Sequence, residues 1–348
     1  MIEIQKALIG KELTKQDIIK LLAIKDKKDQ ELLMTAAREL RFNNFEDAIY
    51  LYGFVYFSTY CQNNCNFCYF RKENAIQRYR KSPKEVLGLA KSLVESGVHL
   101  IDLTMGEDPE YQKDNFSEIV ELSKNIKDAT DIPMMLSPGV MTEQNLDDIA
   151  AVGMDWFALY QETHNKELFK TLRVCQDYDR RMTSKIQAKK RGLLIEEGIL
   201  VGVGESYEDI ADSIIEMKRI GAKQVRVMSF VPQEGSPMEN NPQSDYNLEL
   251  KTIAILRLVF PEALIPASLD IEGLRGLSDR LDAGANVITS IIPPETGLAG
   301  VAQSYMDVDG GGRTVEQVRN VLKVKDLSIG SIDECKKLLE KYKGKSGK

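Results

Sequence analysis

Cysteine and positive charge are both scarce in this chain, and each shortage excludes a class of protein. The 348 residues include five cysteines, and 46 Lys and Arg stand against 53 Asp and Glu, a net charge of −7. This balance argues against nucleic acid or an anionic membrane as the main partner, because both need a positive surface. No apolar run is long enough to span a membrane, and the first residues lack the apolar core of a secretion signal. We therefore expect a cytoplasmic protein whose thiols are reduced and form no disulfide framework.

Three of the five cysteines are crowded into the stretch YCQNNCNFCYF, residues 60–70, as Cys61, Cys65 and Cys68. Cysteine can be a simple packing residue, but the spacing C-x3-C-x2-C among polar Gln and Asn residues favours a metal centre. A structural zinc ion usually takes four ligands. Its fourth ligand would have to come from a residue that is distant in the sequence, namely His99, His164, Cys175 or Cys335. An iron–sulfur cluster is the other candidate, because three thiolates on four irons leave one iron open to bind a second molecule.

Short apolar runs alternate with helical patterns along most of the chain. The runs are 51–58, 99–106, 133–139, 156–162, 199–204, 224–230, 264–270 and 286–292. Their nearly continuous apolar character is typical of parallel strands that are buried on both faces. Capping residues and glycine stops predict helices over 82–97, 142–153 and 206–221. Eight strand–helix units predict an α/β fold, a (β/α)8 TIM barrel with an N-terminal helical segment.

The chain divides into three parts by pattern. Residues 1–48 have apolar stripes at helical spacing and are expected to form N-terminal helices that pack on the barrel. Residues 49–295 would form the barrel itself. Residues 296–348 would be a C-terminal extension, with a turning segment at DVDGGGR and a final helix in which Cys335 is a packing residue.

Charged residues occur at the ends of four predicted strands: Asp102, Glu162, Arg226 and Asp270. In a barrel these ends meet at one mouth, where a buried charge is costly unless it is paired or binds a ligand. Arg226 could form a structural ion pair with Asp102 or Asp270. A zwitterionic ligand is the alternative, because a guanidinium binds a carboxylate through two hydrogen bonds and the aspartates suit ammonium groups. Two carboxylates against one arginine would fit a diamino acid.

The cysteine motif follows an apolar strand and has aromatic residues on both sides of its last cysteine, Phe67 and Tyr69. In these features the chain resembles the radical S-adenosylmethionine (SAM) enzymes. The motifs DLTMGEDP, LSPGVM, ALYQET, RVMSFVPQEGSP, IPASLDIEG and AGANVITSIIPP resemble, more narrowly, the methylornithine synthases of pyrrolysine biosynthesis. This likeness extends from about residue 10 to about residue 300.

The resemblance implies two cofactors, a [4Fe–4S] cluster and SAM, and a role for each matching residue. The cluster ligands would be Cys61, Cys65 and Cys68. The SAM-binding residues would be Tyr69, Glu107, Ser137, Glu162, Arg181, Gly202 and Gly204. The substrate-binding residues would be Asp102, Arg226, Ser268, Asp270 and Ser290. Arg181 and Arg173 could each be a solvated helix charge, and only family position favours Arg181 over Arg173 and Arg180. His164 is interpreted as a surface residue at a helix N-terminus. No acid–base residue is implied, because the radical comes from SAM.

The function implied by the resemblance is an isomerase that converts L-lysine to (3R)-3-methyl-D-ornithine by fragmentation and recombination. An unidentified electron donor would reduce the cluster. The alternative enzyme is another radical SAM protein of the hydrogenase-maturase or biotin-synthase group, acting on a different amino acid or small molecule. Biotin synthase needs a second iron–sulfur site in its barrel, and the predicted strands of this chain carry no cysteines for one. A zinc-stabilised or cluster-carrying scaffold is the non-enzyme alternative, and it leaves the polar strand ends without a purpose.

Overall fold

The computed structural model describes residues 1–293, 296–298, 300 and 313–346. The glycines of the expected turning segment, at 310–312, lie outside these residues. None of the described helices has the length and apolar character that a membrane crossing requires.

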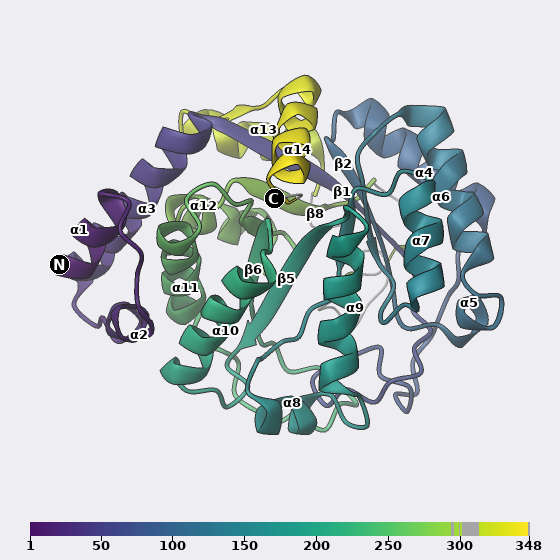
Figure 1. Cartoon of the computed structure of the whole chain (residues 1–348), viewed down its shortest axis with the longest axis horizontal. Coiled ribbons are helices and arrows are strands. Elements are labelled where there is room, and N and C mark those ends of the chain that lie inside the picture. The colour runs from purple at the N-terminus through teal and green to yellow at the C-terminus, as the bar shows by residue number, and fades with distance from the viewer. Residues whose placement is uncertain (294–295, 299, 301–312, 347–348) are drawn as a thin grey trace.

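Eight parallel strands form the central sheet (Figure 1). They are β1 (Ala48–Ser58), β2 (Leu100–Met105), β3 (Met134–Ser137), β4 (Trp156–Ala158), β5 (Leu194–Val201), β6 (Gln224–Ser229), β7 (Pro266–Ser268) and β8 (Val287–Ile291). Their order in the sheet is β6-β5-β4-β3-β2-β1-β8-β7, and a bridge from Gln224 to Leu264 joins the two outer strands. The sheet is therefore a nearly closed barrel, and the predicted α/β barrel of eight strands is confirmed.

Helices surround the barrel and connect its strands. They are α4 (Pro83–Ser96), α5 (Pro109–Lys113), α6 (Ser117–Thr130), α7 (Glu143–Ala151), α8 (Lys166–Leu172), α9 (Tyr178–Lys190), α10 (Tyr207–Ile220), α11 (Tyr246–Val259) and α12 (Leu274–Asp282). Helix α4 begins with a capping box from Ser82 and ends at left-handed Gly97, and α10 repeats this pattern from Ser206 to Gly221. These two helices match their predicted bounds, whereas α7 ends at Ala151, before the predicted stop at Gly153.

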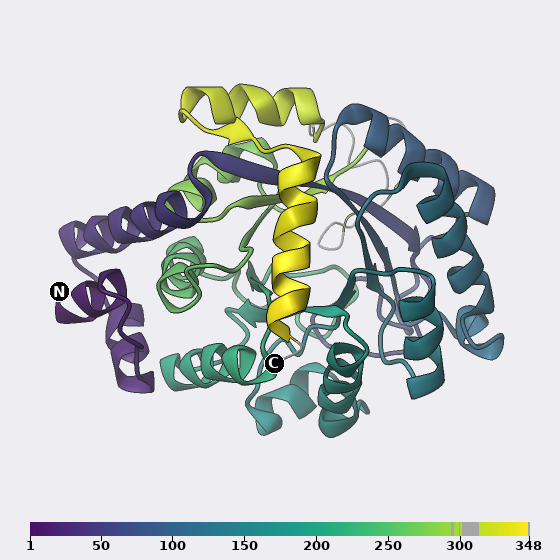
Figure 2. The same ribbon diagram turned by 45° about the horizontal axis from the view of Figure 1, so that its top comes forward.

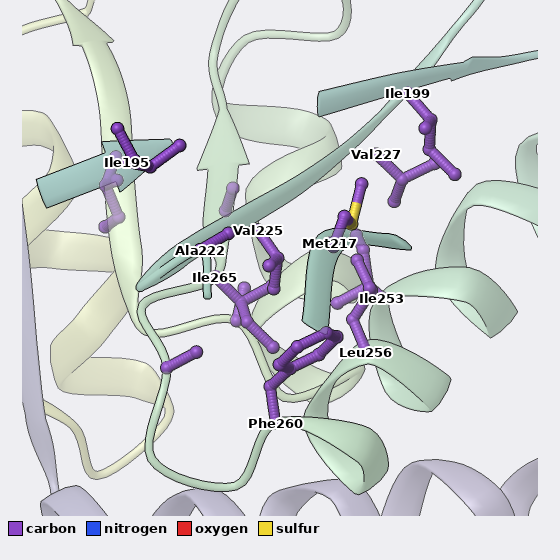
Figure 3. Packing of buried hydrophobic residues seen from close by; sticks show 14 of the residues in the cluster. Ile195, Ile199, Met217, Ala222, Val225, Val227, Ile253, Leu256, Phe260 and Ile265 are labelled. Atoms are coloured by element: carbon purple, nitrogen blue, oxygen red, sulfur yellow. The ribbon is translucent and has the colours of Figure 1, made fainter. Parts of the chain in front are cut away.

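Alternation along β6 shows how the barrel separates its core from its interior. Val225 and Val227 face outward and pack against Ile253 and Leu256 of α11, as Figure 3 shows. Successive side chains on a strand point to opposite faces, so Arg226 between the two valines points into the barrel. Each fully buried aliphatic side chain stabilises the fold by about 1.5–3 kcal/mol. The outer packing therefore holds the strand in the register that aims Arg226 inward.

The N-terminal helices α1 (Ile2–Leu8), α2 (Lys15–Leu22) and α3 (Lys27–Phe45) contact α10 and α11 on one side of the barrel (Figure 1). Lys251 on α11 fixes this contact by donating hydrogen bonds to the carbonyls of Leu22 and Ile24, at 2.7 and 3.2 Å. Arg41 on α3 likewise donates to the carbonyl of Leu281 at 2.6 Å. The contact of these helices with the barrel agrees with the sequence, while the division of the chain at residues 48 and 295 stays a prediction.

The C-terminal segment closes the barrel at the N-terminal ends of its strands. Helix α13 (Val315–Val324) is followed by β9 (Ser328–Ile329), which pairs with β1, and by α14 (Ile332–Ser346). Figure 2 shows α14 lying across this end of the barrel. Its residues Cys335, Leu339 and Tyr342 pack in one cluster with Trp156 and other residues from the first positions of the strands. Cys335 is buried, as expected of a packing residue, while α13 and β9 were not predicted.

Candidate functional site

A cavity of about 250 Å³ opens at the carboxyl ends of the strands, where barrel enzymes place their active sites. It brings together most of the residues that the sequence singled out. Those in its lining are Cys61, Cys65, Cys68, Asp102, Glu107, Ser137, Glu162, Arg181, Arg226, Ser268, Asp270 and Ser290. Tyr69, Gly202 and Gly204 are outside this lining. Segments far apart in the sequence thus form one polar site, with the cysteine loop at one side and the charged strand residues around it.

The cysteine loop follows β1 and is tied down by arginine. Arg78 donates hydrogen bonds to loop carbonyls at 2.5–3.2 Å, those of Thr59, Phe70, Arg71 and Asn74. The end of β2 packs closely against the loop, because a Cβ on Gly106 would lie 2.2 Å from the carbonyl oxygen of Tyr60. The loop is therefore held in a fixed shape by groups other than the cysteines.

The three thiols of the loop have the donor chemistry that an iron–sulfur cluster uses. Burial raises the pKa of Cys61 to about 11 and raises that of Cys68 as well, so each thiolate needs a strong cation beside it. Within the described residues, no group of three or more His, Cys, Asp or Glu is arranged to hold one metal ion. Thiolates bound to separate irons do not have to converge on one point. The donor set therefore fits a [4Fe–4S] cluster.

Two of the four proposed fourth ligands of a zinc site, His99 and Cys335, are used elsewhere. His99 accepts a hydrogen bond from the amide of Leu51 at 2.8 Å and contacts the carbonyl of Gly330 at 2.7 Å. Cys335 is buried under α14 at the opposite end of the barrel. The zinc alternative therefore has no support from either residue.

Two arginine–glutamate pairs lie next to the cysteine loop. Arg181 donates to Glu107 at 3.0 Å and Arg173 to Glu162 at 2.5 Å, and both guanidinium groups also donate to the carbonyl of Tyr160. Glu162 is held at a positive φ of 66°. The interpretation of Arg173 as a solvated helix charge is wrong, because its side chain lines the cavity. The stretch RVCQDYDRRM alone does not reveal this, since Arg173 comes just after the end of α8 and Arg181 lies within α9.

Gly139 makes room for one of these glutamates. Its φ is +88°, and a Cβ there would lie 2.0 Å from Cγ of Glu107. Glycine tolerates this backbone conformation without strain and leaves space for a neighbouring side chain. The LSPGVM motif therefore shapes the position of Glu107.

Gly202 and Gly204 also have positive φ values, of 88° and 102°. A Cβ on Gly202 would lie 2.4 Å from the Cβ of Ser244, and the Gly202 amide donates to Glu205 at 2.7 Å. Close packing within the protein thus accounts for Gly202. A contact of either glycine, or of Tyr69, with SAM stays a prediction.

Arg226 lies deeper in the cavity, where its partner is a residue that the sequence did not single out. Its Nε donates to Glu196 at 2.8 Å and its Nη1 donates to Thr289 at 3.3 Å. The hydroxyl of Tyr160 donates to the other oxygen of Glu196 at 2.9 Å. The suggested structural partners, Asp102 and Asp270, were therefore wrong. Glu196 was missed because β5 was predicted to begin at 199 and begins at Leu194.

The two aspartates of the cavity differ in their partners. Asp270 accepts hydrogen bonds from Arg313 at 2.9 Å and from Ser290 at 2.8 Å, and Ser268 donates to it at 3.1 Å. Asp102 accepts from its neighbour Thr104 at 2.9 Å. Burial, reinforced by the charge of Glu196, raises the pKa of Asp102 to about 7. Asp102 is thus a buried carboxyl group that a cationic ligand would bring fully into its charged form.

A third polar group lies behind β4 and β5. Lys185 forms a fully buried ion pair with Glu197, whose other oxygen accepts from the amide of Gln161 at 2.8 Å. Burial opposes ionisation of Glu197, but Lys185 and His164 outweigh it and hold its pKa at about 2. The His164 side chain is 3% exposed and its Nε2 lies 3.7 Å from Glu197, so its interpretation as a surface residue is wrong. This group fixes the backbone that leads into Glu162.

Comparison with known proteins adds an independent result. Residues 55–216 match the model of the Radical SAM superfamily. The chain is 44% identical to the 3-methylornithine synthase of Methanosarcina acetivorans over 316 residues, which cover 90% of this chain and 89% of the relative. It is 30% identical to the [FeFe] hydrogenase maturase subunit HydE of Thermotoga maritima, with 82% of each covered. A crystal structure of methylornithine synthase superimposes with a TM-score of 0.92 at 41% identity, covering 97% of this chain and 99% of that one.

Proposed function

The chain belongs to the 3-methylornithine synthase family of radical SAM enzymes, and on this premise we propose that it rearranges L-lysine to (3R)-3-methyl-D-ornithine, the first step of pyrrolysine biosynthesis. The observation that carries the proposal is the charge distribution inside the cavity. Its buried groups suit a ligand with one carboxylate and an excess of positive charge.

The cofactor sites follow from the residues beside the cysteine loop. Cys61, Cys65 and Cys68 would hold a [4Fe–4S] cluster. Glu107 and Arg181 would bind the amino and carboxylate groups of SAM, because they are a carboxylate and a guanidinium placed 3.0 Å apart. A [4Fe–4S] cluster and SAM held by these residues would supply a 5′-deoxyadenosyl radical. Glu162 and Ser137 would contact the ribose and the methionyl part, and Tyr69, Gly202 and Gly204 would lie near adenine.

Charge counting supports a substrate like lysine. Asp102, Arg226 and Asp270 line the inner cavity, and Glu196 and Arg313 are the ion-pair partners of the last two. Glu249 and Arg280 of the lining pair with each other and are left out of this set of five. With all five ionised, this set carries one net negative charge. Lysine carries two ammonium groups and one carboxylate, a net charge of +1, so its binding neutralises the site. Buried charges are tolerated when they are balanced in this way.

Individual contacts suggest how lysine lies. Glu196 and Thr289 take the Nε–H of Arg226 and one hydrogen of its Nη1, which leaves the other donors of the guanidinium for a carboxylate. Asp102 has Thr104 as a partner but no ion-pair partner among the described residues, and it would bind an ammonium group. Asp270, already oriented by Arg313, Ser268 and Ser290, would bind the second ammonium.

Containment is the remaining task of the chain. A rearrangement through two fragments requires a cavity that keeps both fragments and excludes water. Apolar side chains contribute to the cavity lining, among them Phe54, Tyr56, Leu159 and Leu200. The hydrophobic cluster that α14 forms with Trp156 fills the opposite end of the barrel. Access is therefore confined to the end that carries the cysteine loop.

The similarity to the maturase HydE favours a second candidate, a radical SAM reaction on a different small molecule. The acidic excess around Asp102 supports the lysine reaction over this one. A scaffold protein would bind metal without cleaving SAM. The electron donor and the cytoplasmic location stay predictions.

The test is anaerobic. Protein reconstituted with iron and sulfide is incubated with SAM, a reductant and L-lysine. The products are separated by chromatography, and their molecular masses are measured by mass spectrometry. A new peak of unchanged mass supports the isomerase, because methylornithine and lysine are isomers. Cleavage of SAM to 5′-deoxyadenosine with lysine untouched would support the second candidate, and metal binding without cleavage would support the scaffold. Asp270→Ala should bind the cluster and lose turnover.

A further inference from the structure

Gln176 connects a cluster cysteine to the two arginines of the site. It precedes α9, and its Nε2 lies 3.0 Å from Sγ of Cys65. Its Oε1 accepts hydrogen bonds from Nη1 of Arg173 at 3.3 Å and from Nη1 of Arg181 at 3.2 Å. Guanidinium groups only donate, so the amide oxygen must face the arginines. The amide N–H is therefore directed at the cysteine sulfur, and the opposite orientation of the side chain would break three favourable contacts.

A hydrogen bond to a cluster sulfur changes the reduction potential of the cluster. The reduced cluster carries one more negative charge than the oxidised one, and part of this charge resides on the thiolate sulfurs. A donor aimed at the sulfur stabilises the reduced form more than the oxidised form, so the potential rises. Two cationic arginines on the amide oxygen polarise the amide and strengthen its N–H as a donor. We propose that Gln176 raises the reduction potential of the cluster bound by Cys61, Cys65 and Cys68, and thereby makes it easier to reduce.

This role rests on the proposed function only in so far as the three cysteines hold a cluster. The other two cysteines differ from Cys65 in their donors. Cys61 and Cys68 receive hydrogen bonds from backbone amides. Arg173 also approaches Cys65, but its Nη1 lies 3.7 Å from the sulfur and its Nη2 is bound to Glu162. Gln176 thus supplies the nearest side-chain donor to the cluster sulfurs among the described residues.

Gln176 can be changed without disturbing the core. It is partly exposed, and it borders a polar surface depression of about 600 Å³ that it shares with Gln62, Asn63 and Gln112. Gln176→Leu removes the donor at nearly constant size and charge. Gln176→Glu keeps an oxygen for the arginines and places a negative charge near Cys65. Gln187→Leu is the matched control, because it makes the same exchange within α9 at a residue whose carbonyl and side-chain oxygens accept hydrogen bonds from Arg191.

The experiment uses the reconstituted holoprotein without SAM. Iron and sulfide are first quantified in each variant. The fraction of reduced cluster is then measured by electron paramagnetic resonance over a series of ambient potentials set with dithionite. At the wild-type midpoint, we expect the ratio of reduced to oxidised cluster to fall about tenfold in Gln176→Leu, which equals a shift of about 59 mV for one electron. This ratio should fall further in Gln176→Glu, and in Gln187→Leu it should equal that of the wild type.

The outcomes separate the inference from the proposed function. A full cluster in every variant with unchanged potentials would overturn the role of Gln176 and leave the proposed function standing. Loss of iron and sulfide from both Gln176 variants would also overturn it, because a purely structural residue behaves in that way. Failure of the wild-type protein to bind a cluster would refute the proposed function itself. Potentials in the order wild type, Gln176→Leu, Gln176→Glu, from highest to lowest, support the inference.

Discussion

Replacing Asp102 by asparagine should stabilise the fold and remove its activity at the same time. Asp102 is a buried carboxyl group whose described side-chain partner is the hydroxyl of Thr104, and its pKa is raised to about 7. Asparagine has almost the same shape and can still accept the hydrogen bond from Thr104, but it never ionises. A residue kept for ligand binding rather than for folding should behave in this way.

The magnitude follows from linkage between protonation and folding. In the unfolded chain Asp102 ionises near its ordinary pKa of 3.8, and in the folded protein it ionises near 7. Between these values the folded state binds the extra proton, so the free energy of unfolding of the wild type falls as pH rises through this window. From pH 5 to pH 7 this loss amounts to about 2 kcal/mol, because each full unit contributes about 1.36 kcal/mol and the slope declines as the folded carboxyl begins to ionise. The advantage of Asp102→Asn should grow by the same amount and level off once the folded carboxyl is fully ionised.

Urea unfolding of the metal-free protein at pH 5, 6, 7 and 8 measures this difference. Asp155→Asn is the control with the opposite sign. Burial opposes ionisation of Asp155, but Lys127 and Lys343 outweigh it and lower its pKa. Its substitution should destabilise the protein by an amount that stays nearly constant from pH 5 to pH 8, because the wild type loses this stability only as pH falls below the unfolded pKa of 3.8. A constant gap between wild type and Asp102→Asn from pH 5 to pH 8 would refute the reasoning, as would lysine turnover by that variant in the reconstituted enzyme.

Three further predictions concern other parts of the site and fold. Gly139→Ala should raise the KM for SAM more than tenfold and lower the unfolding midpoint, because its Cβ would displace Glu107 and its left-handed backbone is strained for alanine; an unchanged KM would contradict this. Burial lowers the pKa of His99, so the stability of the wild type should fall as pH drops below about 6.5, the pKa of histidine in the unfolded chain. In His99→Gln, the urea midpoint should not fall with pH in this range. Lys185→Met should lower the free energy of unfolding by about 3–5 kcal/mol, because it leaves Glu197 buried and without its lysine partner. Adding Glu197→Gln should restore most of the lost stability. No recovery in the double variant would exclude this pairing.

Periodicity and capping made the barrel predictable. Each strand is buried on both faces, so its apolar run is visible in the sequence, and Ser82 with Gly97 delimits α4 by local chemistry alone. The C-terminal segment was less accessible, because β9 has two residues and forms through its pairing with β1. Tertiary contact rather than local pattern defines such an element.

The charged partners inside the barrel were the hardest part to predict. Glu196 and Glu197 are adjacent at the start of β5, and a run with two acids does not resemble a buried strand. Alternation sends them to opposite faces, with Glu196 toward Arg226 inside and Glu197 toward Lys185 outside. The sequence gives the charges but not the partners, because partners come from neighbouring strands and helices. Arg313 illustrates the same limit, since it reaches Asp270 from 43 positions away.

Tyr160 connects the proposed cofactor site with the proposed substrate site, through its backbone carbonyl on one side and its side-chain hydroxyl on the other. Its carbonyl accepts from Arg173 and Arg181, the arginines beside the cysteine loop, and its hydroxyl donates to Glu196, which orients Arg226. The proposed cofactor and substrate groups are therefore joined by hydrogen bonds through a single, partly buried residue. The proposed radical rearrangement requires the cofactor and the substrate to keep a fixed separation, because small displacements at reacting centres cost large factors in rate. Tyr160 gives the barrel a means of keeping that separation that does not depend on the loops around the mouth.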